Sequence, residues 1–243
     1  MFGAVLAVVS AFILFVWKEI AYIPSHFYKD RRKKTILARK YLRDISSGFL
    51  KTLGAKVEVV VKDRESFENL DRDKGIVFVA NHQSNFDIPV ILSGIDMDLG
   101  FVAKIEMRSW PFFYRWMRRG KYIFIDRSNA REGMKSIKKA VDIVKSGYPT
   151  VIFPEGERSI TGEIGIFKKG SFKLAVDANG IIVPMTICGA INIQKRGSVA
   201  IHRNQKIKLI IEKPIDVSKL SIEEKKNLSQ EVRDMIVKNY EKI

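Results

Sequence analysis

The chain has 243 residues, of which 46% are hydrophobic and 10% aromatic, so its composition argues against disorder and fits one sizeable domain with a short appendage. Its formal net charge of +16 indicates an anionic partner: membrane lipid, nucleic acid or a phosphorylated substrate. The one cysteine, Cys188, excludes an intramolecular disulfide and a cysteine-rich metal site, and it favours a cytoplasmic location.

The N-terminus begins with an apolar segment, Met1 to Trp17, in which Ser10 is the one polar side chain. As a helix it would be roughly 25 Å long, a little short of the ~30 Å hydrocarbon core of a bilayer. A secretory signal peptide fits poorly, because no basic segment precedes the apolar run and no small-residue cleavage site follows it. Pro24 is expected to end the helix.

A second helix is predicted over residues 29–53, where apolar residues recur at helical spacing from Leu37 to Leu53. A basic amphipathic helix beside a short apolar helix is typical of attachment to anionic membrane surfaces, and an apolar segment would have no role in a nucleic-acid-binding protein. The alternative is that this helix packs on the globular part with its charges in water. The basic residues of the helix are Arg31, Arg32, Lys33, Lys34, Arg39, Lys40 and Arg43.

We therefore expect residues 1–53 to form a two-helix membrane-binding motif and residues 54–243 to form an α/β domain. The short apolar run favours a hairpin that dips into one leaflet over a segment that spans the bilayer once. Attachment through these helices would place the protein on the cytoplasmic face of the cell membrane.

From residue 54 onward, short apolar runs alternate with helical patterns. This alternation predicts a mixed, largely parallel central sheet flanked by helices, with ligands at the carboxyl ends of the strands. The C-terminal helix begins at Ser221, where Glu224 completes a capping box. The expected strands are residues 57–61, 76–80, 99–103, 122–125, 151–153, 181–183 and 207–211, and the other expected helices are residues 86–92, 110–117, 129–145 and 172–178.

A histidine follows the second predicted strand, and a carboxylate stands five residues later: His82 and Asp87. Residues 84–87 favour turns and helix starts, so Asp87 is expected to fold back towards His82. An imidazole held by a carboxylate through one ring nitrogen can accept a proton at the other, which suits the activation of a hydroxyl that attacks a carbonyl. A purely structural hydrogen bond is the alternative interpretation.

Three further turns stand where strands are expected to end: residues 126–127, 154–159 and 184–186. Arg127 and Arg158 carry forked donors that match a phosphate, and a glycine between them in sequence, Gly156, lets backbone N–H groups approach an anion. Each turn alone can be an ordinary polar loop. Together with His82, they predict one pocket at the edge of the sheet.

These segments resemble the motifs of the glycerolipid acyltransferases, the lysophosphatidate (1-acylglycerol-3-phosphate) acyltransferase family. Residues 81–87, Asn-His-Gln-Ser-Asn-Phe-Asp, resemble the NHxSxxD motif, and residues 153–159 resemble the FPEGTRS motif. Residues 124–127 and 183–187 are similar to the second and fourth motifs. Glu157 stands where the family usually has threonine, so we expect it to point away from a phosphate or to tune head-group choice.

The resemblance implies that a fatty acyl thioester, acyl-CoA or acyl carrier protein, acylates the 2-hydroxyl of 1-acylglycerol 3-phosphate and gives phosphatidate. It implies His82 as the general base and Asp87 as the group that orients it. Ser84 as an enzyme nucleophile is a weaker alternative, because a thioester is already activated. The residues implied to bind the acceptor are Lys104, Arg127, Glu155, Gly156 and Arg158.

No metal and no organic cofactor is expected, because His26 and His202 lack metal-ligand neighbours and the sequence has no dinucleotide fingerprint or P-loop. The expected partners are anionic membrane lipid, lysophosphatidate and the acyl donor, and no nucleic acid. One alternative is an acyltransferase for another acceptor, such as glycerol 3-phosphate or another lysophospholipid. The other, a non-enzymatic binder of anionic lipid or nucleic acid, would leave the spacing of His82 and Asp87 unexplained.

Overall fold

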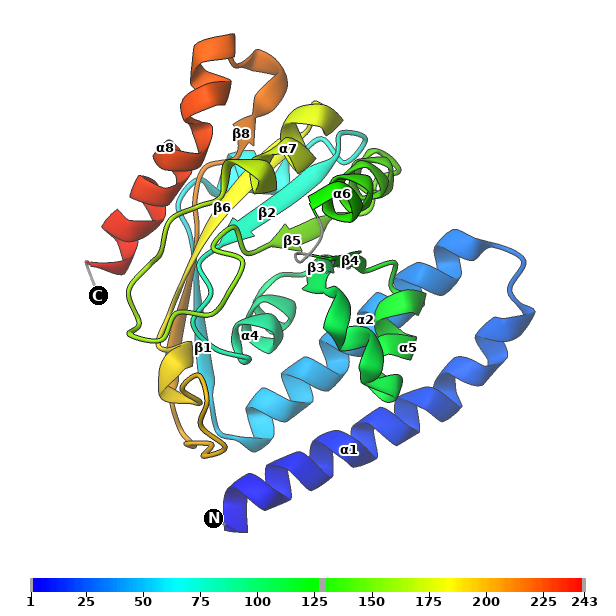
Figure 1. Ribbon diagram of the computed structural model, residues 1–243. Coiled ribbons are helices and arrows are strands. Elements are labelled where there is room, and N and C mark those ends of the chain that lie inside the picture. The colour runs from blue at the N-terminus through cyan, green and yellow to red at the C-terminus, as the bar shows by residue number, and fades with distance from the viewer. Residues whose placement is uncertain (1, 127–129, 242–243) are drawn as a thin grey trace.

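The computed structural model describes residues 2–126 and 130–241, together with their side chains except those of residues 2–8, 11, 112 and 130. Its centre is a twisted sheet with helices on both faces (Figure 1). The strand order is β1-β7-β6-β2-β5-β3-β4, with β8 beside β6. β6 is antiparallel to β7 and β8 while the other pairs are parallel, which confirms the predicted mixed, largely parallel sheet.

The strands are β1 (Lys56–Val61), β2 (Ile76–Ala80), β3 (Gly100–Lys104), β4 (Ile123–Ile125), β5 (Thr150–Ile152), β6 (Ile181–Cys188), β7 (Lys206–Ile211) and β8 (Ile215–Asp216). The α-helices are α1 (Phe2–Tyr22), α2 (Arg31–Thr52), α3 (Arg64–Glu68), α4 (Asp87–Gly94), α5 (Pro111–Arg119), α6 (Ala130–Lys145), α7 (Lys169–Ala178) and α8 (Ile222–Tyr240). The short 3-10 helices in the described residues are η1 (Ile23–Phe27), η2 (Ile105–Ser109), η3 (Ala190–Asn192) and η4 (Val217–Lys219).

The central strand β2 is apolar throughout because helices cover both of its faces. Phe78 and Ala80 contribute to the core on the side of α2 and α4, whereas Val77 and Val79 contribute to the core on the side of α6, α7 and α8. This alternation follows from the two-residue period of a strand. The carboxyl end of β2 therefore lies between two packed layers, and His82 follows it.

The predicted elements are present within a few residues of their expected bounds, and Ser221 caps α8 through the predicted capping box. One prediction at the sheet edge is wrong. β6 continues to Cys188, so residues 184–186 lie inside a buried strand and not in a turn after it. Proline usually interrupts a strand, yet Pro184 sits in register with Val79 of β2. The short elements α3 and β8 were not predicted.

The first helix packs along α2 and α5 through aromatic side chains. Phe15 and Tyr22 contact the fully buried Trp116, with ring centroids 5.9 and 5.3 Å apart. The charges of α1 also face the protein: Glu19 accepts hydrogen bonds from Arg119 at 2.9 and 3.0 Å, and Lys18 pairs with an aspartate of α2. The charged pair near the end of the apolar run is therefore neutralised internally.

The opposite side of α1 is an apolar surface, and η1 extends it with Ile23 and Phe27. On α1 itself, the exposed side chains of this surface are Val9, Phe12, Ile13, Val16, Trp17 and Ile20. When only the described residues are counted, no helix has the combination of length and apolar character that crossing a membrane requires.

Helix α2 begins at the N-cap Asp30, whose side chain accepts hydrogen bonds from the N–H groups of Arg32 and Lys33. Its C-terminal turn contributes Leu50, and the following Leu53 lies in the same large core as β2 and α4. Helix α2 therefore shares the core of the α/β unit. The membrane-associating role of residues 1–53 remains a prediction.

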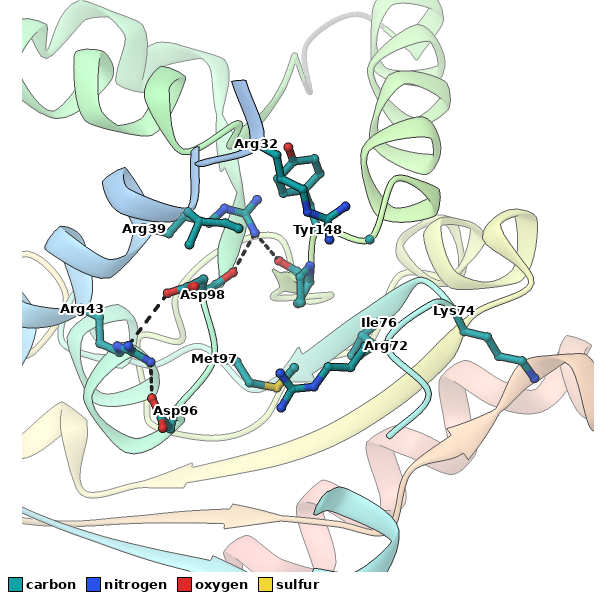
Figure 2. A pocket seen from close by; sticks show the side chains of 13 residues that line it. Arg32, Arg39, Arg43, Arg72, Lys74, Ile76, Asp96, Met97, Asp98 and Tyr148 are labelled. Atoms are coloured by element: carbon teal, nitrogen blue, oxygen red, sulfur yellow. Dashed lines mark hydrogen bonds and ion pairs between the residues drawn. The ribbon is translucent and has the colours of Figure 1, made fainter. Parts of the chain in front are cut away.

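The basic surface predicted for this helix was wrong in one position, because Arg39 is only 1% exposed. Its guanidinium donates to the carbonyl of Gly120 at 2.7 Å and to that of Pro149 at 2.9 Å. It also donates to the carbonyl of Asp98 at 2.9 Å (Figure 2). Burial lowers the pKa of Arg39 to about 10. A side chain at Gly100 would collide with this guanidinium, since an added Cβ would lie 2.3 Å from Nη2.

Arg39 lines a cavity of about 250 Å³ together with Arg32, Arg43 and Asp98 (Figure 2). Pro149 immediately precedes β5 and Asp98 lies two residues before β3, so this cavity lies at the amino ends of those strands. This cavity is therefore at the opposite end of these strands from the edge where the predicted site lies.

Candidate active site

The predicted contact between His82 and Asp87 is present. Nδ1 of His82 lies 2.7 Å from Oδ2 of Asp87, whose side chain is fully buried. The same oxygen accepts hydrogen bonds from the backbone N–H groups of Gln83 and Ser84 at 2.7 and 2.9 Å. Because a carboxylate can only accept, this geometry assigns a ring proton to Nδ1, which in the neutral imidazole leaves the lone pair on Nε2.

Local sequence explains why Asp87 folds back. It is the first residue of α4, where a negative charge is favoured by the helix dipole, and its N–H bonds the carbonyl of Ser84 at 3.3 Å. Asn81 holds the other side of the turn by donating to and accepting from the backbone of Ile187 in β6, at 2.9 and 2.8 Å. The asparagine side chain thus continues the sheet by one step beyond β2.

His82 is held on three sides. Its ring stacks on Phe153 with centroids 4.0 Å apart and an interplanar angle of 14°. Its backbone N–H donates to Oε1 of Glu155 at 2.7 Å, and its carbonyl accepts from the N–H of Ser159 at 2.8 Å. The turn after β5 therefore fixes the imidazole, and the two motifs form one unit.

Glu155 links two backbone segments. Its second carboxylate oxygen accepts from the N–H of Gly165 at 2.9 Å, in the loop that leads to α7. Burial raises the pKa of the Glu155 carboxyl, although the two N–H donors oppose that rise. Both oxygens have protein partners, and the expectation that Glu155 binds the acceptor remains a prediction.

The hydroxyl of Ser84 is buried and donates to the carbonyl of Gln194 at 2.8 Å. It also accepts from the N–H of Phe86 at 3.2 Å. Its hydrogen therefore points at a carbonyl and not at an imidazole, which argues against Ser84 as an activated nucleophile.

The other predicted acceptor-binding residues that the structure describes lie at the same edge. Arg127 lies outside the described residues. Gly156 has a φ of +82°, a conformation that favours glycine, and Arg158 is half-buried. Glu155 and Arg158 line an open pocket of about 310 Å³ together with Ser159. Within the described ranges, no group of three or more His, Cys, Asp or Glu residues is arranged to hold a metal ion.

Glu157 does not point away from the basic residues of this edge. Its carboxylate lies 3.2 Å from Nζ of Lys104, at the end of β3, and 2.8 Å from Nη2 of Arg196. Hydrogen bonds from Arg196 and Lys104 lower the pKa of Glu157. Arg196 was not identified from the sequence, because it belongs to none of the four motifs and reaches Glu157 only in the folded chain.

A comparison with protein families places most of these residues in one region. The model of a family described as Acyltransferase matches residues 58–188. This region contains His82, Asp87 and the turn after β5, whereas Arg196 lies beyond it.

Curated relatives and a solved structure agree with this match. A probable 1-acyl-sn-glycerol-3-phosphate acyltransferase of Mycoplasma pneumoniae is 29% identical over 234 residues, which cover 92% of this chain and 83% of that protein. A chloroplastic 1-acyl-sn-glycerol-3-phosphate acyltransferase of Arabidopsis thaliana is 33% identical over 159 residues, or 65% of this chain and 44% of that protein. The crystal structure of the 1-acyl-sn-glycerophosphate (LPA) acyltransferase PlsC from Thermotoga maritima superposes with a TM-score of 0.74 and 27% identity, covering 96% of this chain and 95% of that one.

Proposed function

Since this chain belongs to the acyltransferase family, we propose that it transfers a fatty acyl group from an acyl thioester to the 2-hydroxyl of 1-acylglycerol 3-phosphate and so produces phosphatidate. The observation that carries the proposal is the bond between Nδ1 of His82 and the buried carboxylate of Asp87, which leaves Nε2 as the base. The names of the relatives support lysophosphatidate as the acceptor.

In the proposed reaction, Nε2 of His82 takes the proton of the lipid 2-hydroxyl while the hydroxyl oxygen attacks the thioester carbonyl. The Asp87 carboxylate stabilises the imidazolium that forms. When the tetrahedral intermediate collapses, the carbon–sulfur bond breaks and the thiolate leaves, and it recovers the proton from the imidazolium. Acyl-CoA and acyl carrier protein both supply this thioester, so the chemistry at His82 is the same for either donor.

Basic residues at the same edge are proposed to hold the acceptor's phosphate. Lys104 and Arg158 supply charge, Gly156 lets the backbone of its turn approach the phosphate closely, and Arg127 belongs to the same predicted set. One alternative is a different acceptor, such as glycerol 3-phosphate or another lysophospholipid. The Glu157 carboxylate lowers the net positive charge of this edge, which would suit a lysophospholipid whose phosphate diester carries one negative charge.

The apolar surface of α1 is proposed to rest in the cytoplasmic leaflet of the cell membrane, beside anionic lipid. A lysolipid then needs to leave the bilayer only as far as its head group for its 2-hydroxyl to meet His82. Lifting its acyl chain into water would cost about 0.8 kcal/mol for each methylene exposed.

The test is an acyl-transfer assay of the purified protein on vesicles that crosses acceptors with donors. The acceptors are lysophosphatidate, lysophosphatidylcholine and glycerol 3-phosphate, and the donors are acyl-CoA and acyl carrier protein. We expect phosphatidate to form fastest from lysophosphatidate, and His82→Ala to lower kcat by roughly two to four decades. Faster acylation of another acceptor, or near-normal turnover in His82→Ala, would contradict the proposal.

A further inference from the structure

The loop between η3 and β7 is attached directly to the segment that carries His82. The carbonyl of Gln194 accepts from the Ser84 hydroxyl at 2.8 Å, and its side-chain oxygen accepts from the amide of Asn85 at 3.1 Å. A turn follows, in which the N–H of Ser198 bonds the carbonyl of Lys195 at 3.1 Å. Two residues after the attached Gln194, this loop therefore presents a side chain at the edge of the site.

That side chain is Arg196, and it is held in place. The next residue, Gly197, has a φ of +81°, which lets the turn form without strain. Nη1 of Arg196 donates to the carbonyl of Arg158 at 2.6 Å, while Nη2 meets the Glu157 carboxylate at 2.8 Å. A guanidinium fixed on two sides and one-third exposed is prearranged to bind an anion.

The arrangement around Glu157 is an anion between two cations. Lys104 comes from the end of β3, Glu157 from the turn after β5, and Arg196 from the loop after β6. The side chains of Lys104 and Glu157 are 43% and 54% exposed, so a solute can reach the carboxylate. Two cations with one carboxylate leave a net positive charge at this position.

We propose that Arg196 and Lys104 form a head-group subsite, in which Glu157 is an internal counter-ion that the acceptor's phosphate displaces. This inference rests on the proposed function and adds Arg196 and Glu157 to it as residues that set acceptor affinity. A phosphate monoester carries about −1.5 to −2 charges at pH 7 and offers three acceptor oxygens, so it competes well against one carboxylate.

The inference predicts effects of opposite sign on the KM for lysophosphatidate. Arg196→Ala should raise KM about tenfold with kcat little changed, because it removes a charge-assisted hydrogen bond from the bound head group. Glu157→Thr should lower KM several-fold, because the competing carboxylate is gone. A merely structural Glu157–Arg196 pair would instead give changes of the same sign.

The experiment measures kcat and KM for wild type, Arg196→Ala, Arg196→Gln, Glu157→Thr and the double variant Arg196→Ala with Glu157→Thr. The glutamine variant retains a donor for the Arg158 carbonyl. Lys195→Ala is the matched control, since it removes one exposed positive charge from the same loop and should leave KM unchanged. Calorimetric titration with glycerol 3-phosphate measures anion binding independently of turnover.

Opposite shifts in KM, with Lys195→Ala unchanged, support the subsite. If lysophosphatidate is acylated but Arg196→Ala does not alter KM, or both substitutions raise it, the subsite is wrong and the proposed function stands. If lysophosphatidate is not acylated, the proposed function is overturned. The subsite is still supported in that case if glycerol 3-phosphate binds more weakly to Arg196→Ala and more tightly to Glu157→Thr than to wild type. The absence of both turnover and these binding differences would overturn both.

Discussion

The carboxylate of Glu155 accepts a hydrogen bond from the backbone N–H of His82 at 2.7 Å, so a side chain after β5 holds the residue that carries the proposed base. Glu155→Ala should lower kcat about 10- to 100-fold with little change in KM, because small displacements of a catalytic group are costly. Glu155→Gln retains one oxygen that can accept from an N–H group, so its kcat should lie between those of wild type and Glu155→Ala. Steady-state kinetics on lysophosphatidate vesicles measures both constants. A rise in KM alone would favour the alternative role of Glu155 in binding the acceptor.

Asp87→Asn should lower kcat strongly, by about two decades or more, because an amide oxygen can still accept the N–H bonds but carries no charge to stabilise the imidazolium. The control is Ser84→Ala in the same turn. It removes a hydroxyl that bonds the Gln194 carbonyl, and it should keep kcat within a few-fold of wild type. A comparable loss in both variants would restore Ser84 as a candidate nucleophile.

Arg39→Met should destabilise the fold without touching the site. The substitution leaves three carbonyls without their donor, which should cost about 3 kcal/mol of unfolding free energy or more. For a chain of this size, Tm should fall by roughly 6–12 °C. Arg43→Met is the control in the same helix, because its bonded partner Asp96 is exposed and its second partner Asp98 is 4.0 Å away, and such pairs contribute about 1 kcal/mol or less. Equal Tm values for the two variants would contradict the structural role of Arg39.

Cys188 should be chemically silent in the native protein. Burial raises the pKa of its thiol to about 12, so little thiolate exists at pH 8.5. Iodoacetamide should label it only after unfolding in urea, as mass spectrometry can measure. The raised pKa also means that the native state keeps a proton that the unfolded state loses. Unfolding free energy should therefore fall as pH rises above about 9.

Binding to vesicles should depend on the exposed side of α1. Phe12 and Trp17 are 60% and 64% exposed, and replacing both with serine should weaken partitioning onto anionic vesicles by at least about tenfold. Val199→Ser is the control, because Val199 is exposed on a loop before β7. Sedimentation with vesicles measures the bound fraction. Unchanged binding of the double variant would show that another surface attaches the protein.

Local pattern predicted the parts of the fold that local physics determines. A buried apolar run predicted β2, and the turn after it predicted the start of α4. The contact between Asp87 and His82 was also predictable, because a turn and a helix start within five residues bring the two side chains together. The continuation of β6 past Pro184 was missed, because proline usually ends a strand and only the neighbouring strands stabilise it there.

Contacts between residues that are distant in sequence could not be predicted from the sequence. The helical spacing of α2 does not indicate that the Arg39 side chain is buried. The carbonyls that accept its hydrogen bonds come from three loops that are distant in sequence. The ion pair between Glu157 and Arg196 likewise forms only because the folded chain brings the two residues together. Glu155 was recognised through its motif, but its bonds to the backbone of His82 and Gly165 appear only in three dimensions.

The inward ion pairs of α1 have a consequence for how the protein would work on a bilayer. Because Glu19 is bound to Arg119 and Lys18 to α2, the apolar side of α1 belongs to a helix that is attached to the rest of the fold by its own ion pairs. If α1 binds as proposed, substrate and enzyme meet by lateral diffusion within one leaflet. Reaction rate should then follow the surface mole fraction of lysophosphatidate, and diluting it with inert lipid should slow turnover even when its bulk concentration is constant.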